Sequence, residues 1–104
     1  MRGVRHIMVR QRGVKGISII VGQLRKAESL VPGIQRAILW DTTGEIDVES
    51  VEPFLFDAVR YYRVVGECCM AASRHVFSLA HLTPVTDMNE ITYHGLQAIY
   101  ETLQ

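Results

Sequence analysis

The chain has 104 residues, of which 48% are hydrophobic and 21% charged, a composition typical of a folded domain and too apolar for a disordered chain. Eleven Lys and Arg residues balance eleven Asp and Glu residues, so no net field draws the protein to nucleic acid, and we do not expect a nucleic-acid partner. No apolar run reaches the roughly 18 residues of a membrane helix, so we expect no membrane insertion. We expect one domain over residues 1–104.

The cysteine and histidine spacings predict no metal and no cofactor. Cys68 and Cys69 are adjacent and have no other cysteine to pair with, so we predict a reducing, cytoplasmic setting without disulfides. The four histidines are scattered, and none stands in a zinc-binding spacing. The glycines match neither a phosphate-binding loop nor a dinucleotide fingerprint.

The first third of the chain predicts a short strand followed by a helix. Residues 4–9 (VRHIMV) read as a strand, and Gly13 and Gly16 punctuate the chain after it. In residues 17–30 the apolar side chains fall at helical spacing, which favours a helix over most of this stretch. The β-branched run 17–21 (ISIIV) could instead make the first half a strand.

Residues 34–48 predict a β-hairpin. Residues 34–40 are rich in strand formers and partly apolar on both faces, as in a central strand. Residues 41–44 (DTTG) form a turn sequence, because Asp can bond the backbone two residues on and Gly tolerates positive φ. Residues 45–48 alternate polar and apolar side chains, which suits a short edge strand.

The clearest helical pattern covers residues 50–66. Ser50 is a candidate N-cap, Pro53 suits the first turn, and an apolar stripe runs along the whole stretch. Residues 68–72 have good helix character and could extend this helix.

The last third of the chain predicts a short element and a second helix. Residues 75–82 read as a strand or a helix end, and residues 89–103 as a helix with one apolar side. Helices and strands thus alternate along the whole chain, which predicts an α/β sandwich (α+β) with a mixed or antiparallel sheet flanked by helices.

Cys68 and Arg74 form a candidate catalytic pair. Their spacing, in CCMAASR, resembles the nucleophile loop of cysteine phosphatases and rhodaneses, where a thiolate sits in a cradle of N–H groups and an Arg binds an oxyanion. Such a loop usually contains glycine, and this one has none. We therefore favour a buried helical thiol over a catalytic one.

Charged residues cluster at two places in the sequence. A basic arm opens the chain, which predicts either an anion-binding arm or pairing within the fold, and we favour the pairing. The acids at Asp41, Glu45, Asp47 and Glu49 match a calcium loop only loosely, so a solvated acidic edge strand is the favoured interpretation. The basic residues of the arm are Arg2, Arg5, Arg10, Arg12 and Lys15.

The order of the predicted elements resembles the Roadblock/dynein light chain family. There a helix ends at a Pro-Gly break, a strand leads to a D-x-x-G turn and a second strand, and a long helix follows. The matching parts here are residues 17–30, 32–33, 36–40, 41–44, 45–48, the stretch from residue 51 and the last helix from residue 89. The resemblance implies a homodimer and a partner such as a small GTPase or a motor complex.

Three further stretches resemble STAS domains of anti-sigma-factor antagonists and sulfate transporters. They are GEID at residues 44–47, RHVFSLAHLTPVTD at 74–87 and GLQAI at 95–99. In that family a D-S-x-G-L turn carries a regulatory serine, and Thr92 is the nearest hydroxyl here. This resemblance implies a kinase-like or transporter partner.

Both resemblances imply a small interaction module without catalysis of its own. We predict a non-enzymatic regulatory or scaffolding module, dimeric and bound to a protein partner, with the Cys68/Arg74 enzyme as the alternative from another class. The working surface is expected on the helix from residue 51 and the adjoining strand. The residues expected there are Trp40, Phe54, Ala58, Tyr61 and Tyr62.

Overall fold

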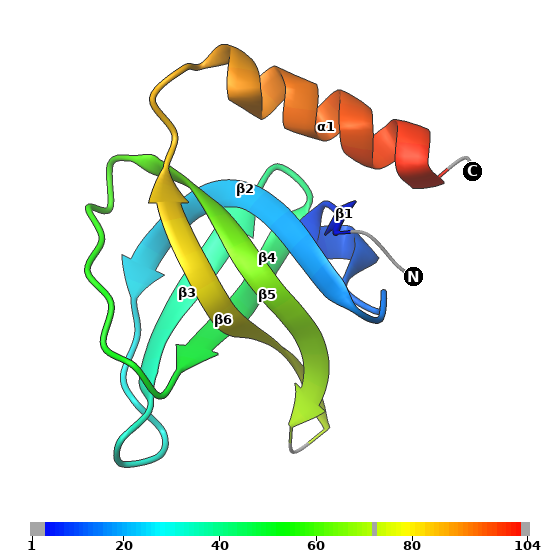
Figure 1. Ribbon diagram of the computed structural model, residues 1–104. Helices are drawn as coiled ribbons and strands as arrows, with labels where there is room; N and C mark the ends of the chain where they lie inside the picture. Colours follow the sequence, from blue (N-terminus) through cyan, green and yellow to red (C-terminus); the bar gives the residue numbers. More distant parts are fainter. Residues whose placement is uncertain (1–3, 72, 103–104) are drawn as a thin grey trace.

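The computed structural model describes residues 4–71 and 73–102, which form a closed β-barrel with one α-helix packed against it (Figure 1). The barrel strands are β2 (Ile17–Lys26), β3 (Gln35–Asp41), β4 (Gly44–Ser50), β5 (Tyr61–Ala71) and β6 (Arg74–Pro84). Their order is β2-β3-β4-β6-β5, and the pairing of β5 with β2 closes the barrel. The short strand β1 (Arg5–His6), a 3-10 helix (Val9–Gln11) and α1 (Asn89–Thr102) lie at one end.

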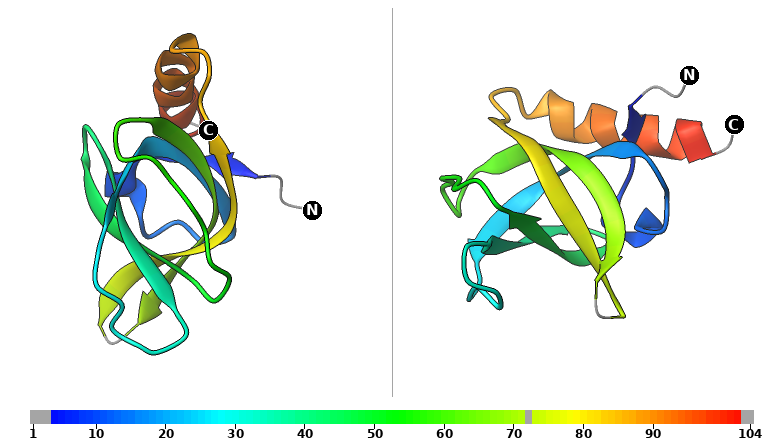
Figure 2. Two further views of the ribbon diagram at one scale, coloured as in Figure 1. Left: turned by 90° about the vertical axis from the view of Figure 1, so that its left-hand side faces the viewer. Right: turned by 60° about the horizontal axis from the view of Figure 1, so that its bottom comes forward.

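The predicted α/β sandwich is wrong, because the sheet curls on itself and buries its apolar face without flanking helices (Figure 2). α1, which packs against β1 and β2, is the one α-helix among the described residues. Alternate residues of the strands fill the barrel interior. The buried core cluster consists of Ile7, Val9, Ile20, Leu24, Ala37, Leu39, Ile46, Val48, Tyr62, Val64 and Phe77.

Two glycines allow the barrel to close. A Cβ at Gly22 of β2 would overlap the backbone oxygen of Trp40, and one at Gly66 of β5 would overlap the backbone oxygen of Ser78. Gly66 also lies at the register shift between β5 and β6. β2 pairs with β5 through residues 17–23 and with β3 through residues 23–26, so the strand bends next to Gly22 as it changes partner.

The helix predicted over residues 17–30 is wrong. The alternative, a strand over the first half of this stretch, is confirmed, and the strand continues to Lys26 as β2. Ser18, Ile20 and Leu24 point into the barrel. Val21 points the other way but is also buried, only 4% exposed, near His94 of α1. Burial of both faces removes the period-two pattern and leaves a spacing that imitates a helix.

The helix predicted over residues 50–66 is also wrong. Residues 51–60 form an extended loop, and β5 begins at Tyr61. Gln35 holds the loop, because its side chain donates to the Phe54 oxygen (2.8 Å) and accepts from the Phe54 nitrogen (2.9 Å). The apolar stripe that predicted this helix combined apolar residues of the loop 51–60 with apolar residues of β5. Residues 68–71 continue β5 rather than a helix, and residue 72 lies outside the described residues.

The hairpin over residues 34–48 is confirmed as β3 and β4, joined at Asp41 and Gly44. β4 is not an edge strand, however, because it also pairs in parallel with β6. Residues 75–82 are a strand, within β6. The last predicted helix is confirmed as α1 up to Thr102, and residue 103 lies outside the described residues.

The N-terminal segment is part of the fold rather than a solvated arm. Ile7 and Val9 are fully buried in the core. The Asp41 carboxylate accepts hydrogen bonds from the Val9 nitrogen (2.9 Å) and the Thr43 nitrogen (2.7 Å). Backbone geometry alone explains the turn sequence at residues 41–44. In the structure the turn has a second role, because its Asp41 holds the N-terminal segment that fills one end of the barrel.

Candidate functional site

The outward surface of β2, β3 and β4, together with Arg74 at the start of β6, forms a polar face that we call the outer face. Residues that lie directly opposite each other on paired strands share one side of the sheet, so the side chains of the outer face form rows that run across the strands. Trp40 lies between Gln23 and Glu45, and Ile38 lies between Arg25 and Asp47. Arg36 lies opposite Glu49 in the third row.

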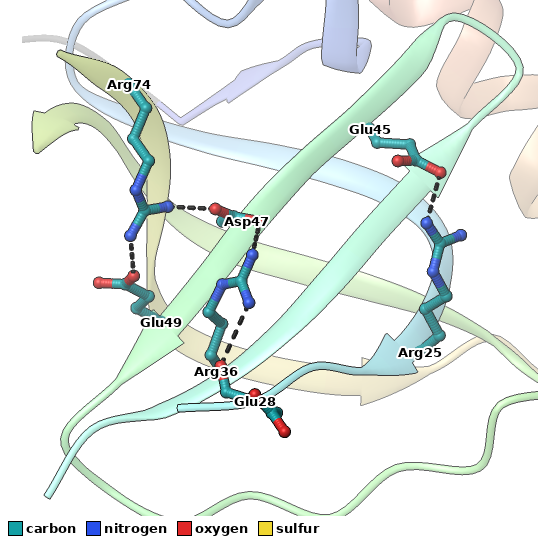
Figure 3. A network of polar contacts seen from close by, with 7 residues as sticks. All are labelled: Arg25, Glu28, Arg36, Glu45, Asp47, Glu49 and Arg74. Carbon is teal, nitrogen blue, oxygen red and sulfur yellow. Dashed lines mark hydrogen bonds and ion pairs between the residues drawn. The ribbon is translucent and has the colours of Figure 1, made fainter. Parts of the chain in front are cut away.

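Ion pairs run diagonally between these rows (Figure 3). Arg25 donates to Glu45 at 2.8 Å, and Arg36 donates to Asp47 at 3.0 Å and to the backbone oxygen of Glu28 at 3.2 Å. Arg74 bridges two carboxylates of β4. Arg74 pairs with Asp47 and donates to Glu49 at 2.7 Å.

The ion pairs of the outer face differ in burial and therefore in strength. The Arg25 and Glu45 side chains are about half exposed, at 49% and 53%, so water and salt screen their attraction. Arg36 and Asp47 are each only 19% exposed, which makes theirs the least screened pair of the face. Hydrogen bonding to Glu49 raises the pKa of Arg74, and the Asp47 charge adds to this effect.

Trp40 is the aromatic side chain of the outer face. It is 37% exposed and is the single tryptophan of the chain. A small hollow beside it is lined by Tyr61 of β5, by Met8 and by Ile91 of α1. An exposed flat ring that borders a hollow is suited to stacking against another flat group.

α1 is fixed to the barrel by polar contacts on its inner side. The His94 Nε2 donates to the Ile7 oxygen at 2.7 Å, and Glu101 accepts from the His6 nitrogen at 2.9 Å. Arg63 of β5 donates to Glu90 at 2.6 Å. Burial lowers the pKa of His94, so its ring is held neutral with the proton on Nε2.

The opposite side of α1 is apolar and exposed. Tyr93, Leu96, Ile99 and Tyr100 are between 53% and 70% exposed, whereas His94 and Ala98 on the inner side are at most 4% exposed. Apolar residues at helical spacing normally face a core. On α1 they form an exposed stripe that no described residue of the chain covers.

The candidate catalytic pair is not assembled. Cys68 lies within β5 opposite Phe77, and Arg74 is held by the β4 carboxylates. Burial, together with the neighbouring Cys69, raises the pKa of Cys68 to about 11, so the thiol stays protonated at neutral pH. This arrangement gives no support to the hypothesis of a cysteine-dependent phosphatase or sulfurtransferase, because the Arg74 guanidinium is already paired with carboxylates and Cys68 is a protonated strand residue.

The predicted interface residues do not share one surface. Trp40 is on the outer face, and Tyr61 borders the hollow beside it. Tyr62 is buried, 6% exposed, and its hydroxyl accepts from the Asp57 nitrogen at 2.8 Å. Phe54 packs on the core and stacks on Phe56, while Ala58 is exposed in the loop.

The sequence interpretation missed the network centred on Asp47. Part of its signal was present, because drawing the predicted hairpin in register places Ile38 opposite Asp47 and puts Arg36 on the same side of β3 two residues away. No group of His, Cys, Asp and Glu within residues 4–71 and 73–102 is arranged to hold a metal ion. No helix in the same residues is long and apolar enough to cross a membrane.

No family model matches the chain, and no curated protein matches it either. Solved structures do match. One is a chain of a replication protein A heterotrimer bound to single-stranded DNA, 25% identical, with 99% of this chain and 98% of that chain covered and a TM-score of 0.85. Another belongs to the Stn1–Ten1 complex of S. pombe, 11% identical, covering 94% and 90%, with a TM-score of 0.79.

A third match names the fold. It is an OB domain from Thermoplasma acidophilum, 14% identical, covering 82% of this chain and 90% of that one, with a TM-score of 0.62. The chain therefore has the OB fold, a closed five-stranded barrel, here followed by one helix.

The Roadblock and STAS resemblances are wrong, since neither gives a barrel and the matching structures are OB folds. The partners they implied, a small GTPase, a motor complex, a kinase or a transporter, lose their basis with them, and so does the predicted homodimer. The expectation against a nucleic-acid partner is also overturned, because the matched replication protein A structure contains single-stranded DNA. Net charge alone does not decide this question, because a neutral chain can still present arginines and an exposed aromatic ring on one face.

Proposed function

We propose that this protein binds single-stranded nucleic acid on its outer face, as one subunit of a larger complex. The observation that carries the proposal is the position of Trp40, which is exposed on β3 on the same outer face that carries Arg25 and Arg36. OB folds bind oligonucleotides on the second and third barrel strands and on the loop before them, which here are β3, β4 and residues 27–34.

The chemistry of the outer face supports a single strand over a duplex. A base that is free of its partner can stack on the Trp40 ring, and stacking is tolerant of sequence because every base has a flat face. Bases in a duplex are already stacked on each other and cannot reach the ring. The replication protein A match, which covers nearly the whole chain at 25% identity, supports the same class of ligand.

The fluorescence of Trp40 gives a direct test, because the chain has one tryptophan. We expect oligo(dT) to quench this fluorescence and a duplex of equal length to quench it far less. Trp40→Ala should weaken binding of a labelled oligo(dT) by about tenfold, while Trp40→Phe retains most of it. Tyr93→Ala on the exposed side of α1 is the matched control. Equal binding by Trp40→Ala and the wild type would reject the outer face as the binding site.

A second observation supports the subunit role. The exposed stripe of Tyr93, Leu96, Ile99 and Tyr100 is suited to an apolar helix of another chain, because such a stripe is stable when a partner covers it. The matched structures named a heterotrimer and the Stn1–Ten1 complex are both assemblies of different chains. We propose another OB-fold subunit as the partner.

Association can be tested with Leu96→Glu, which places a charge at the centre of the stripe. Affinity purification of the wild type from its native cells should retain a second OB-fold chain, and Leu96→Glu should lose it. Trp40→Ala should retain it, because Trp40 lies on the outer face. Recovery of the same chain by Leu96→Glu would reject α1 as the interface. The cytoplasmic setting inferred from the free cysteines stays a prediction.

A further inference from the structure

The three guanidinium groups of the outer face are all held by carboxylates of one strand. Glu45, Asp47 and Glu49 are alternate residues of β4, so their side chains leave the sheet on the same side. Their partners come from three other strands, β2, β3 and β6. β4 therefore neutralises the cations of the whole outer face (Figure 3).

Asp47 is the centre of this network. Its Oδ1 accepts from Arg36 at 3.0 Å, and its Oδ2 pairs with Arg74, whose other terminal nitrogen donates to Glu49 at 2.7 Å. Each oxygen of one carboxylate thus faces a guanidinium from a different strand. Two oxygens of one phosphate group can make the same pair of contacts, because guanidinium groups recognise carboxylate and phosphate by the same geometry.

We infer that the β4 carboxylates are built-in competitors of the phosphate groups, an inference that rests on the proposed function. A phosphate that reaches Arg36 and Arg74 must displace Asp47, and the displaced carboxylate then repels it. The charges of the face contribute little net attraction as a result. The outer face binds a single strand mainly by stacking on Trp40, and Asp47 limits its affinity.

The salt dependence of binding follows from the same balance. Three guanidinium groups and three carboxylates cancel, so a bound strand releases few counterions from its phosphates. For a single strand, each phosphate neutralised adds about 0.7 to the slope of log affinity against log salt. Removing the charge of Asp47 leaves one guanidinium in excess, which should steepen the slope by about this amount.

The test compares Asp47→Asn with the wild type in titrations of labelled oligo(dT) at several salt concentrations. Asp47→Asn keeps the shape of the side chain and removes its charge. We expect it to bind about fivefold more tightly at low salt, with the steeper slope. Glu67→Gln is the matched control, because it removes one exposed carboxylate from β5, which pairs with neither β3 nor β4, and should leave affinity and slope unchanged.

Glu45→Gln is the second variant and guards against misfolding of Asp47→Asn. Glu45 is half exposed, so its removal should leave the fold intact, free Arg25 and raise affinity by about twofold. Unchanged or weaker binding by both variants, with wild-type binding intact, would overturn the inference and leave the proposed function standing. Binding by no variant at any salt concentration would overturn both. If the two variants bind oligo(dT) and the wild type does not, the result would support the inference in its strongest form, with the β4 carboxylates preventing binding altogether.

Discussion

The outer face and the exposed side of α1 are both open to solvent, but the first consists mainly of charged side chains and the second of apolar ones. On the outer face each of the three arginines meets a carboxylate, and one aromatic ring stands among them. On α1 the exposed side carries large apolar side chains, and the polar contacts of the helix lie on its inner side. The two surfaces are therefore suited to different partners.

The difference shows that two surfaces without net charge can have different chemistry. The balance of eleven basic and eleven acidic residues is reproduced locally on the outer face, where the charges are paired with each other. The α1 stripe is neutral because it lacks charge altogether. Binding to the first should respond to salt, and binding to the second should not.

The largest effect should come from opening the barrel that carries both surfaces. Gly66→Ala places a Cβ against the backbone oxygen of Ser78, which no rotamer change can relieve, and should lower the free energy of unfolding by about 3 kcal/mol. Gly95→Ala on α1 meets no atom and should stabilise the helix by up to ~1 kcal/mol. Urea denaturation measures both. Equal stabilities of the two variants would contradict the close approach at Gly66.

A smaller loss of stability should affect the end of the barrel that carries α1 and leave the outer face unchanged. Asp41→Ala removes the acceptor of the Val9 and Thr43 nitrogens and should cost about 2 kcal/mol of stability. Hydrogen exchange should rise in the N-terminal segment and in α1, which is bonded to that segment through Ile7. Exchange along the middle of β4 should change little, and a uniform rise over the whole barrel would argue against a local anchor.

Salt should have a still smaller effect, and it should change the binding affinities of the two surfaces differently. Raising the salt concentration fourfold should weaken oligo(dT) binding by only a few-fold, because the outer face has no excess of cations. Association through α1 should hold or strengthen, since apolar contacts are not screened. Equilibrium titrations of both partners provide the measurement, and a steep salt dependence of oligo(dT) binding would contradict the neutral outer face.

The smallest effect should come from pH. Burial depresses the pKa of His94 in the folded state below its ordinary 6.5, so acidification protonates the unfolded chain first and stability falls as pH drops through about 6.5. His6, Asp41 and Glu101 face the same ring. Urea midpoints at pH 8 and pH 6 should differ, and His94→Gln should flatten the difference. The exposed His75→Gln is the control and should retain it.

The hairpin and the last helix could be predicted because local sequence decides them. The turn at residues 41–44 has its own chemistry, and residues 89–102 carry an apolar side with helical spacing. The full length of β2 could not be predicted. The β-branched run 17–21 allowed a strand over the first half, but burial of Val21 near α1 removes the alternation that marks a strand. The exposed Trp40 was named as a contact residue, but its role needed the neighbours that the barrel brings to it.

By itself the sequence determined the pairing of β3 with β4, the turn between them and α1, since these depend on residues close together in the chain. Only the tertiary structure decided that the sheet closes, because closure joins β2 to β5 through contacts 38 to 50 residues apart. It also decided the network of the outer face. Arg74 reaches Asp47 across 27 positions only because β6 lies beside β4.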